Sequence, residues 1–579
     1  MRSLSMPDGC PLPMPLAVIL VAAVFDAARA QQAGKLQAEV QPEMPIQHCS
    51  KKAGCKKEQG GITVDESWRW IHGVGGYTNC LQGTTWEPTF CPDPATCARN
   101  CAAEGADLAA YAKNYGIGPM KDVPDSMELK YVAPGGAVAS RVYLTGTDEN
   151  YKVFKLKNRE LTVDIDVSTV PCGLNAALYL IEMQGNGGKG IGNNTAGAKL
   201  GTGYCDAQCP RGVKFINGEA NSVRWGMVPA KSPSGKTKKD GPVGQYGACC
   251  TEMDIFEGNR EAAAFTAHPC QAKVQGLYRC NGTEECGDKG SKLLPGLCDK
   301  EGCGFNSWRM GDQKFFGKGA DFKVDTSKPM TVVTQFITKD GTDTGDLSEI
   351  RRIWLQDGKI IKNSKATALG EDDAGRSLTD SECKAQDEAF DASGGAGSGV
   401  FGKYGGLKSV GEALDRGMVL SMSIWHDTLG RMLWLDGEKL HLKDKIADPG
   451  VSAGPCSFES GDPAELKKKH KDASVKFWNI KYGDIGSTFA AGEPKAKVAG
   501  KFEEVSDAGS GDATVHALRR SRSWAERATL PYKVTSYFGV VAAVGACALL
   551  AHLVARRSWR WLQSARDPSP CTYAHVVPS

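Results

Sequence analysis

The sequence carries almost no net charge, and this limits the partners that it can bind. Lysine and arginine number 70, and aspartate and glutamate 67, among 579 residues, which leaves a formal charge of +3. Proteins that bind nucleic acids usually need an excess of basic side chains to neutralise phosphates. We therefore expect no nucleic-acid partner. Hydrophobic residues at 41% and charged residues at 24% also exclude a wholly disordered chain and a collagen-like chain.

Long helical patterns and internal repeats are also missing. Only residues 102–115 and 379–390 have a pattern that suits short helices. Short segments rich in Val, Ile, Thr, Phe and Trp, bounded by Gly, Asp, Asn or Pro, are typical of strands. Such segments are residues 161–167, 177–181, 330–337, 349–355, 418–425, 432–435 and 475–480. The pattern predicts a mostly β domain of two packed sheets with long loops.

Cysteine, in contrast, is abundant. The 21 cysteines would be reactive thiols or metal ligands in a reducing cytosol, but they form disulfides in an oxidising compartment. Cys205 and Cys209, like the adjacent Cys249 and Cys250, do not form CxxC pairs, and no histidine pair has zinc-finger spacing. The spacing favours a disulfide framework, and we expect no metal ion.

The first 30 residues have the pattern of a secretory signal peptide. Arg2 is basic, Leu16–Phe25 is apolar, and residues 28–30 form a small-x-small cleavage site. An apolar segment of about 10 residues is too short to span a bilayer. We expect residues 1–30, including Cys10, to be removed in the secretory pathway.

A second apolar segment lies near the C-terminus. Residues 536–555 carry no formal charge and are long enough to cross a bilayer of about 30 Å. Arginines follow at once, so residues 556–579 are expected to form a short cytoplasmic tail. Residues 490–535 predict a flexible stalk, which leaves residues 31–489 as an extracellular or lumenal domain. The alternatives are an amphipathic or core helix and a glycolipid-anchor signal, although the latter would lack the basic segment.

Three acids stand close together in the middle of the chain. In a strand, Glu252 and Asp254 would share one face, about 6–7 Å apart. Glu257 has the opposite parity and joins them only if a bulge or sharp bend intervenes, which Gly258-Asn259 makes plausible. Grouped carboxyls suit glycoside hydrolysis, which needs one protonated acid and one ionised nucleophile. The alternatives are a solvated strand edge and a calcium site.

The residues around these acids form a series of motifs. CCTEMDIFEGN stands at residues 249–259 and TAHPC at 266–270. Further motifs, in order, are DESWRW at 65–70, PCGLN at 171–175, GTGYCDAQCP at 201–210, MLWLD at 432–436 and GDIGS at 483–487. Together they closely resemble glycoside hydrolase family 7, the retaining cellobiohydrolases and endoglucanases. The resemblance covers residues 31–487 and implies a curved antiparallel β-sandwich of the jelly-roll, concanavalin-like type.

The resemblance also implies a role for each acid. Glu252 would be the nucleophile, Glu257 the acid/base and Asp254 an assistant to the nucleophile, with His268 near the acid/base. The family cleaves β-1,4-glucosidic bonds of cellulose or related glucans through a covalent glycosyl-enzyme, with the two carboxyls about 5–5.5 Å apart. No metal and no cofactor takes part. A lone histidine before proline can also be only a structural hydrogen-bonding residue.

Tryptophans and polar residues match positions along the family's substrate path. The apolar faces of sugar rings stack on indole, and the matching tryptophans are Trp68, Trp70, Trp425 and Trp434. The polar residues that would bond glucose hydroxyls are Arg141, Asn175, Tyr179, Tyr204, Asp206, Gln208 and Lys214. From the sequence alone, each tryptophan could equally lie in the core.

Features of the two family branches are mixed. Product-site arginines of cellobiohydrolases are missing before Cys298 and before Cys456, and Gly304 replaces an acid. Residues 256–259 and 303–306 look more like the endoglucanase branch. Three segments are long, however: 219–247, 279–297 and 437–454. Because cellobiohydrolases of the family use such loops to roof a tunnel, we expect a cellobiohydrolase-like enzyme, with an endoglucanase of more open cleft as the alternative.

The cysteines provide a separate test of the resemblance. Setting aside Cys10, Cys547 and Cys571 reduces the 21 cysteines to 18, and an even number suits a fully oxidised domain. The resemblance implies the pairs Cys49–Cys55, Cys80–Cys101, Cys91–Cys97, Cys172–Cys456, Cys205–Cys250, Cys209–Cys249, Cys270–Cys298, Cys280–Cys286 and Cys303–Cys383.

The sequence therefore predicts a membrane-tethered, monomeric, retaining β-1,4-glucanase. Glycosylation sequons begin at Asn193 and Asn281, which fits a glycoprotein of the secretory pathway. The alternative is a catalytically silent β-glucan-binding surface protein on the same fold, against which the three intact acids argue.

Overall fold

The computed structural model describes residues 31–231, 237–288, 296–370, 375–390, 399–440 and 444–489. The predicted signal peptide, stalk, membrane segment and cytoplasmic tail lie outside these residues and stay predictions. Within the described part of the chain, no helix is both long enough and apolar enough to span a membrane.

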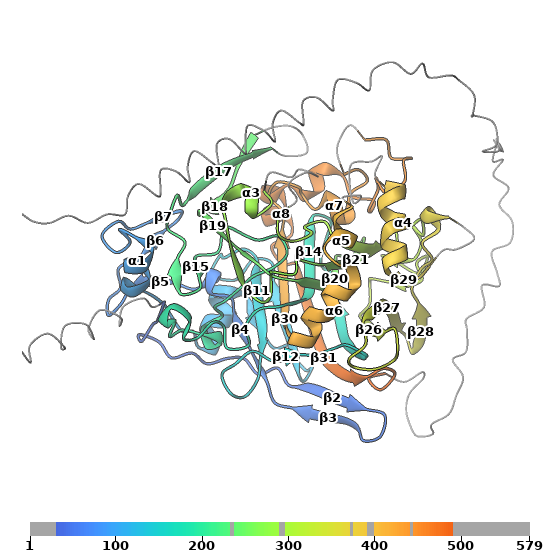
Figure 1. Cartoon of the computed structure of the whole chain (residues 1–579), viewed down its shortest axis with the longest axis horizontal. Helices are drawn as coiled ribbons and strands as arrows, with labels where there is room; N and C mark the ends of the chain where they lie inside the picture. Colours follow the sequence, from blue (N-terminus) through green and yellow to red (C-terminus); the bar gives the residue numbers. More distant parts are fainter. Residues whose placement is uncertain are drawn as a thin grey trace, which may run out of the picture. The chain divides into compact units, whose positions relative to one another are not determined.

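The first of two large sheets contains ten strands among the described residues (Figure 1). Its order is β28 (Lys359–Lys362), β27 (Leu347–Gln356), β26 (Met330–Thr338), β13 (Arg159–Asp166), β31 (Ser474–Asp484), β10 (Ser126–Lys130) and β9 (Ile117–Gly118). β29 (Ser377–Leu378) pairs with β27, and the hairpin of β2 (Ile46–Ser50) and β3 (Gly54–Glu58) joins β31. The pairing is antiparallel except between β2 and β31.

The second large sheet carries the acidic motif. Its order is β23 (Cys303–Asn306), β21 (Ala263–His268), β20 (Glu252–Gly258), β14 (Leu174–Ile181), β30 (Met418–His426), β11 (Ser140–Thr145) and β4 (Gly61–Val64). β12 (Val153–Phe154) adds to β30, and every pairing in this sheet is antiparallel.

Shorter elements surround the sheets. The small strands are β1 (Gln32–Ala33) with β8 (Cys101–Ala103) and β5 (Ile71–Gly73), β6 (Leu81–Gln82) with β7 (Thr85–Trp86), β15 (Phe215–Ile216) with β16 (Glu219–Ala220), β17 (Gly226–Lys231) with β18 (Thr237–Val243), β19 (Tyr246–Cys249) with β22 (Tyr278–Asn281), and β24 (Phe316–Gly317) with β25 (Val324–Asp325). The helices are α1 (Pro94–Asn100), α2 (Leu108–Ala110), α3 (Gly282–Glu285), α4 (Asp380–Phe390), α5 (Val400–Lys403), α6 (Gly406–Arg416), α7 (Leu433–Asp436) and α8 (Pro463–Lys469).

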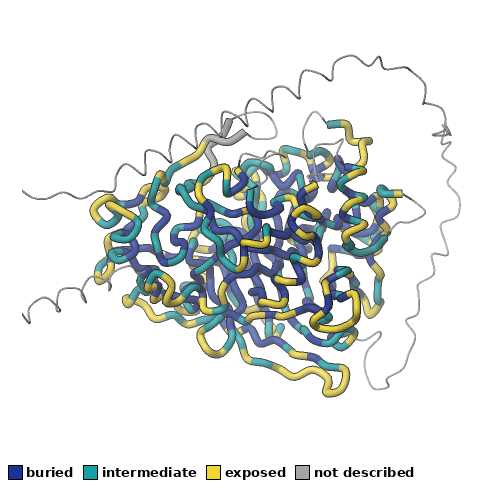
Figure 2. Tube along the Cα trace, in the orientation of Figure 1, coloured by how far each residue is buried: buried dark blue, intermediate teal, exposed yellow. Residues whose placement is uncertain are grey.

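The two large sheets share one apolar core. In β14, Leu178 and Leu180 face this core, whereas Tyr179 faces the other side of the sheet. Across the core, the ring of Phe256 from β20 meets that of Trp354 from β27 at 6.4 Å between centroids. Side chains of both sheets therefore meet as in a β-sandwich, which confirms the predicted mostly β fold. Figure 2 shows burial concentrated along the central strands and exposure along the β2–β3 hairpin.

Most of the predicted elements are present, but two predictions need correction and one helix was not predicted. Residues 433–435 belong to the helical turn α7 rather than to a strand, because Met432 before them has a left-handed φ of 60° that breaks the extended chain. Residues 102–115 are a helix only in their second half, since Ala102 and Ala103 pair in β8. Helix α6 was missed, although its buried Leu407, Val410 and Leu414 have helical spacing.

All nine predicted disulfides are present. Cys205–Cys250 and Cys209–Cys249 tie the loop of residues 201–210 to the residues just before β20. Because these bonds fix both ends of a short loop, they hold Asp206 beside the acidic motif.

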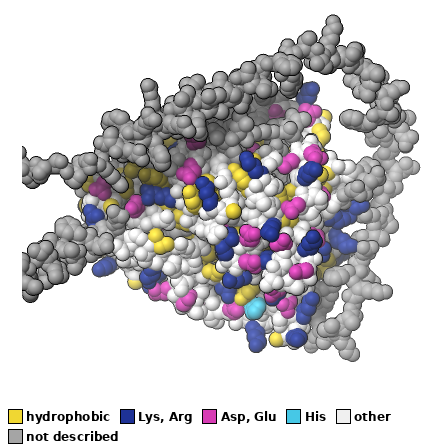
Figure 3. All heavy atoms as spheres, in the orientation of Figure 1, with side chains coloured by type: hydrophobic (Ala, Val, Ile, Leu, Met, Phe, Trp, Pro, Cys, Tyr) yellow, Lys and Arg dark blue, Asp and Glu magenta, His cyan; other side chains and the backbone are white. Residues whose placement is uncertain are grey.

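Charges of both signs are mixed over the surface that Figure 3 shows. Lysines and arginines stand next to aspartates and glutamates there. Pairs such as Lys152 with Glu58 and Arg159 with Asp343 are typical of the described surface. On this face the basic side chains are interspersed with acidic ones and do not form a basic stripe.

Candidate active site

A β-bulge in β20 brings the three acids to one face of the sheet. Asp254 pairs with Tyr179 of β14, but the next pair along is Phe256 with Leu178, so Ile255 is an extra residue. Ile255 and Phe256 both point into the core, and Glu257 therefore emerges on the same side as Glu252 and Asp254. The bulge that the sequence analysis required is present, just before Glu257.

The three acids line one cavity of about 700 Å³. Residues of strands β11, β14, β20, β21, β23 and β30 line it, together with residues of loops and of helices α4 and α7. It contains these predicted residues: Trp68, Arg141, Tyr179, Tyr204, Asp206, Gln208, Glu252, Asp254, Glu257, His268, Trp425 and Trp434. Most of the predicted site residues therefore lie together, although they come from widely separated parts of the sequence.

His268 lies beside the acids as a buried cation. It belongs to β21, where it pairs with Glu252, and its Nε2 lies 2.9 Å from Oδ2 of Asp254. Its Nδ1 lies 2.8 Å from the carbonyl oxygen of Asp299. Burial alone would lower the pKa of His268, but the hydrogen bond and charge of Asp254 outweigh burial and raise it to about 10. At neutral pH both ring nitrogens therefore carry protons and donate.

Glu252 is held by the disulfide-bonded loop. Its Oε2 accepts a hydrogen bond of 3.0 Å from the backbone N–H of Ala207. Burial, followed by the charges of Asp254 and Asp206, raises the pKa of Glu252, while His268 opposes this effect. Burial and the two neighbouring charges therefore favour the protonated form of Glu252, whereas the charge of His268 favours its ionised form.

Glu257 has a different environment. Its Oε1 accepts a 2.7 Å hydrogen bond from the side-chain amide of Asn175, and the N–H of Gly258 donates to the oxygen of that amide at 3.1 Å. Burial, with a smaller contribution from Asp254, raises the pKa of Glu257 to about 8. A carboxyl that keeps its proton at neutral pH can serve as a general acid.

A second buried acid supports the turn after Glu257. Oδ2 of Asp436 accepts hydrogen bonds from the amide of Asn259 at 2.7 Å and from the N–H of Gly173 at 2.8 Å. Burial raises the pKa of Asp436 to about 7. Through Asn259, this residue connects α7 with the end of β20.

Aromatic rings and a guanidinium also line the cavity. The rings of Trp425 and Trp434 lie 6.3 Å apart, and Nε1 of Trp434 donates to Asp427. Arg141 lies over the ring of Tyr204 at 3.3 Å from its centroid. Flat rings beside hydrogen-bonding groups suit sugar rings, whose apolar faces stack while their hydroxyls bond.

Three predicted residues do not line the cavity. Asn175 lies behind Glu257 and bonds it. Lys214 is partly buried, and its Nζ donates to the carbonyl oxygen of Ser67. Trp70 is 37% exposed and stacks on His72 and Tyr77. Asn175 therefore contacts the Glu257 carboxyl, and Lys214 contacts the backbone of Ser67.

Some residues that line the cavity were not predicted from the sequence. The main ones are Thr266, Lys300, Glu301, Asn306, Arg309, Gln386, Ser423 and Leu440. Arg309 is notable because it brings a cation into a cavity where the sequence lacks two expected arginines. Its place just after the CGFN segment of residues 303–306 was the available signal.

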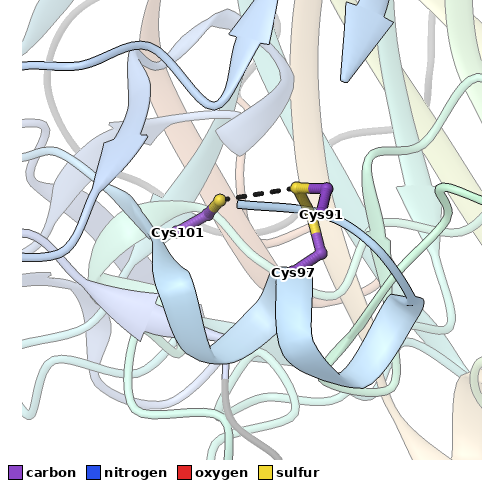
Figure 4. A group of neighbouring side chains, drawn as sticks. All are labelled: Cys91, Cys97 and Cys101. Carbon is purple, nitrogen blue, oxygen red and sulfur yellow. Dashed lines mark hydrogen bonds between the residues drawn. A yellow bond between two sulfur atoms is a disulfide. The ribbon is translucent and has the colours of Figure 1, made fainter. Parts of the chain in front are cut away.

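The cysteine clusters do not offer free thiolates. Cys91, Cys97 and Cys101 lie together, with the sulfurs of Cys91 and Cys101 3.6 Å apart (Figure 4). Cys91 is bonded to Cys97, however, and Cys101 to Cys80. Because metal ligation requires the thiolate, this oxidised cluster is a structural one.

Known proteins resemble this chain over the described domain. Residues 33–489 match the model of glycosyl hydrolase family 7. A cellobiohydrolase from Daphnia pulex has 42% identity and a TM-score of 0.73, covering 79% of this chain and 100% of that chain. An endocellulase from Humicola insolens has 34% identity and a TM-score of 0.63, with coverage of 79% and 100%. A cellobiohydrolase from Melanocarpus albomyces, complexed with cellotetraose, has 35% identity and a TM-score of 0.68, with coverage of 79% and 99%.

Proposed function

Because the chain belongs to glycosyl hydrolase family 7, we propose that it hydrolyses β-1,4-glucosidic bonds of cellulose or a related glucan and retains the anomeric configuration. One observation carries this proposal. Glu252, Asp254 and Glu257 face a single cavity, and the bulge at Ile255 is what puts the third acid beside the other two. The tryptophans can stack on sugar rings, and a carboxyl that is protonated at neutral pH can give its proton to a glycosidic oxygen. Both features suit a neutral polysaccharide as the substrate.

The first step forms a covalent intermediate. A carboxylate oxygen of Glu252 attacks the anomeric carbon, while Glu257 gives its proton to the departing glycosidic oxygen. The bond to the leaving sugar breaks and the sugar leaves as an alcohol. In the second step Glu257, now ionised, takes a proton from water as the water attacks the anomeric carbon and releases Glu252.

Asp254 and His268 prepare the nucleophile. His268, as a cation, keeps Asp254 in place through the 2.9 Å contact, and both lie next to Glu252. The charge of His268 lowers the pKa of Glu252 and so favours its ionised form.

Turnover of cellohexaose by the purified domain tests the reaction. We expect Glu252→Gln and Glu257→Gln to lose activity by about 1,000-fold or more, because each removes one partner of the double displacement. Glu261→Gln is the matched control, since Glu261 follows β20 but lies outside the cavity. The proposal would be contradicted if Glu261→Gln lost activity while Glu252→Gln and Glu257→Gln kept it. Absence of turnover by the unmodified domain would also contradict the proposal and would favour a glucan-binding protein.

We also propose a cellobiohydrolase-like mode of action. Leu440, from the long segment 437–454, lines the cavity, so this loop reaches the substrate path. The 42% identity with the Daphnia cellobiohydrolase, against 34% with the Humicola endocellulase, points the same way. We expect cellobiose as the main early product from cellulose. A rapid fall in the viscosity of carboxymethylcellulose would instead support the endoglucanase mode.

The remaining proposals concern the location of the protein and the finer type of its fold. Asn193 and Asn281 are both exposed, as glycan-bearing asparagines must be. We propose a glycoprotein, tethered by residues 536–555, whose sandwich is the curved jelly-roll type. Glycosidase treatment should increase its electrophoretic mobility, and alkaline carbonate should leave it in the membrane pellet. Release into the carbonate supernatant would contradict the tether.

A further inference from the structure

Arg352 crosses the core of the sandwich as a buried charge. It belongs to β27 in the first sheet and is only 1% exposed. Its Nη2 donates a hydrogen bond to the carbonyl oxygen of Ile255 in β20, in the opposite sheet. Among the described residues, its Nε and Nη1 have no hydrogen-bond partner. Within the described part of the chain, the guanidinium therefore hydrogen-bonds only to this one backbone carbonyl.

Aromatic rings form the rest of its surroundings. The guanidinium lies 4.4 Å from the ring centroid of Phe265 and 5.1 Å from that of Trp354. These contacts offset part of the cost of burying a cation. Burial lowers the pKa of Arg352 to about 9, so it stays charged at neutral pH. An apolar residue of similar volume would fit this core at lower cost.

The carbonyl that Arg352 binds belongs to the extra residue of the bulge. Ile255 has no paired residue on β14 or on β21, because both registers skip it. The extra residue of a bulge loses its regular place in the ladder. Without the bulge, strand alternation would turn Glu257 away from the face of Glu252 and into the core.

We propose that Arg352 is a positioning residue for the reaction: by binding the Ile255 carbonyl, it holds the bulge that sets Glu257 opposite Glu252. This inference rests on the proposed function, because it assumes that Glu257 is the acid. Arg352 itself does not touch the cavity. It acts through the backbone of β20, from the side of the sheet that is opposite to the substrate.

A leaving-group comparison separates positioning from a merely structural role. Dinitrophenyl β-cellobioside releases a weakly basic phenolate and needs no acid, whereas phenyl β-cellobioside needs proton donation from Glu257. The quantity to compare is kcat/KM, which reports steps up to the glycosyl-enzyme. A structural role of Arg352 would change both substrates alike, because it would change only the fraction of folded enzyme.

The reference variant is Glu257→Ala. We expect it to reduce kcat/KM for the phenyl substrate by about 100-fold or more, with little effect on the dinitrophenyl substrate. If Glu257→Ala changes kcat/KM for the two substrates by the same factor, the assignment of Glu257 as the acid is wrong, and the inference about Arg352 is wrong with it. If Glu257→Ala gives the expected result, the assignment of Glu257 holds, and the Arg352 variants then test only the inference about Arg352.

The test variants are Arg352→Met and Arg352→Lys, with Arg351→Met as the control. We expect Arg352→Met to reduce kcat/KM for the phenyl substrate by about 10- to 100-fold, and for the dinitrophenyl substrate much less. Arg352→Lys should show a smaller difference of the same kind, because it keeps a charge and a donor. Arg351 lies on the same strand but faces solvent beside Glu349, so Arg351→Met should behave as the unmodified domain.

Thermal unfolding of each variant completes the experiment. Retained melting temperature together with a selective loss on the phenyl substrate supports the inference. Equal losses on both substrates, or no loss on either, overturn it. If Arg352→Met fails to fold, the same comparison is made with Arg352→Lys, and equal losses in that variant overturn the inference.

Discussion

Glu257 keeps its proton at neutral pH, and its proposed role as the general acid predicts an alkaline limit for the reaction. Because its pKa is raised to about 8, the acid form is present below that pH and is lost as pH rises through it. We therefore predict that kcat/KM for phenyl β-cellobioside declines with a midpoint near pH 8. Asn175→Ala removes the donor that favours ionised Glu257, so its midpoint should be higher. A midpoint that falls in this variant would contradict the assignment.

The contact between Asp254 and His268 also makes a residue-level prediction. Asp254→Asn removes the charge that raises the pKa of His268, so that pKa should fall from about 10 towards 6.5, as an NMR titration can measure. We expect kcat to fall by about 10- to 100-fold, since the nucleophile loses an ordered neighbour. Asp166→Asn, on β13 and paired with Lys476, is a control outside the site. An unchanged His268 pKa would contradict this prediction.

For single residues, sequence motifs predict which side chains line the cavity better than they predict the contacts of each side chain. Glu252 and His268 each stand in a sequence motif, and the structure places both in the cavity. Asn175 is expected to bond sugar, and the structure adds a contact that the sequence did not predict, its hydrogen bond to Glu257. Arg309 and Lys300 were missed because loops bring them to the cavity, and no periodicity describes the path of a loop.

Among the elements, strands were predicted well because alternation and β-branched residues identify them. The need for a bulge in β20 followed from the parity of Glu257, but its position at Ile255 did not, since two consecutive apolar residues suit either face of a buried strand. Segment 432–435 was misread because Leu433 and Leu435 alternate as in a strand, although the left-handed Met432 begins a helical turn.

The disulfide between Cys172 and Cys456 connects two elements that support the site. It joins the residues before β14 to those after α7, where Asp436 bonds the N–H of Gly173. Replacing both cysteines by serine should reduce the free energy of unfolding by about 2–5 kcal/mol, because a long loop is released. We also expect KM to rise, since Trp434 lies on α7.

A second double serine variant provides the control for that prediction. Cys49 and Cys55 close a short loop of the β2–β3 hairpin, only six residues apart. Their replacement should cost less stability and leave KM unchanged, because a short loop loses little entropy on closure. Equal effects of the two variants in denaturant unfolding and kinetics would contradict the reasoning.

For the whole domain, buried acids determine how stability depends on pH. Folding raises the pKa of Glu257 from 4.5 to about 8 and that of Asp436 from 3.8 to about 7. The folded state therefore binds these protons more tightly, so their contribution is complete below about pH 4 and is lost as pH rises to 8. His268, with its raised pKa, contributes in the same direction at higher pH.

We predict that the melting temperature falls between pH 5 and pH 8.5. Glu257→Gln removes one of the titrating groups, so its melting temperature should fall less over the same interval. Calorimetry of both proteins at several pH values provides the measurement. A melting temperature that rises steadily from pH 5 to pH 8.5 would contradict the prediction.

The sulfur atoms shown in Figure 4 have a practical consequence for anyone who produces this protein. With Cys91 only 3.6 Å from the neighbouring bridge, a single reduced thiol there can attack Cys101 and exchange one bridge for another. Recombinant protein made without a disulfide isomerase should therefore be a mixture of disulfide isomers that differ in the pairing of Cys80, Cys91, Cys97 and Cys101. Peptide mapping under non-reducing conditions would identify the scrambled fraction before any assay is interpreted.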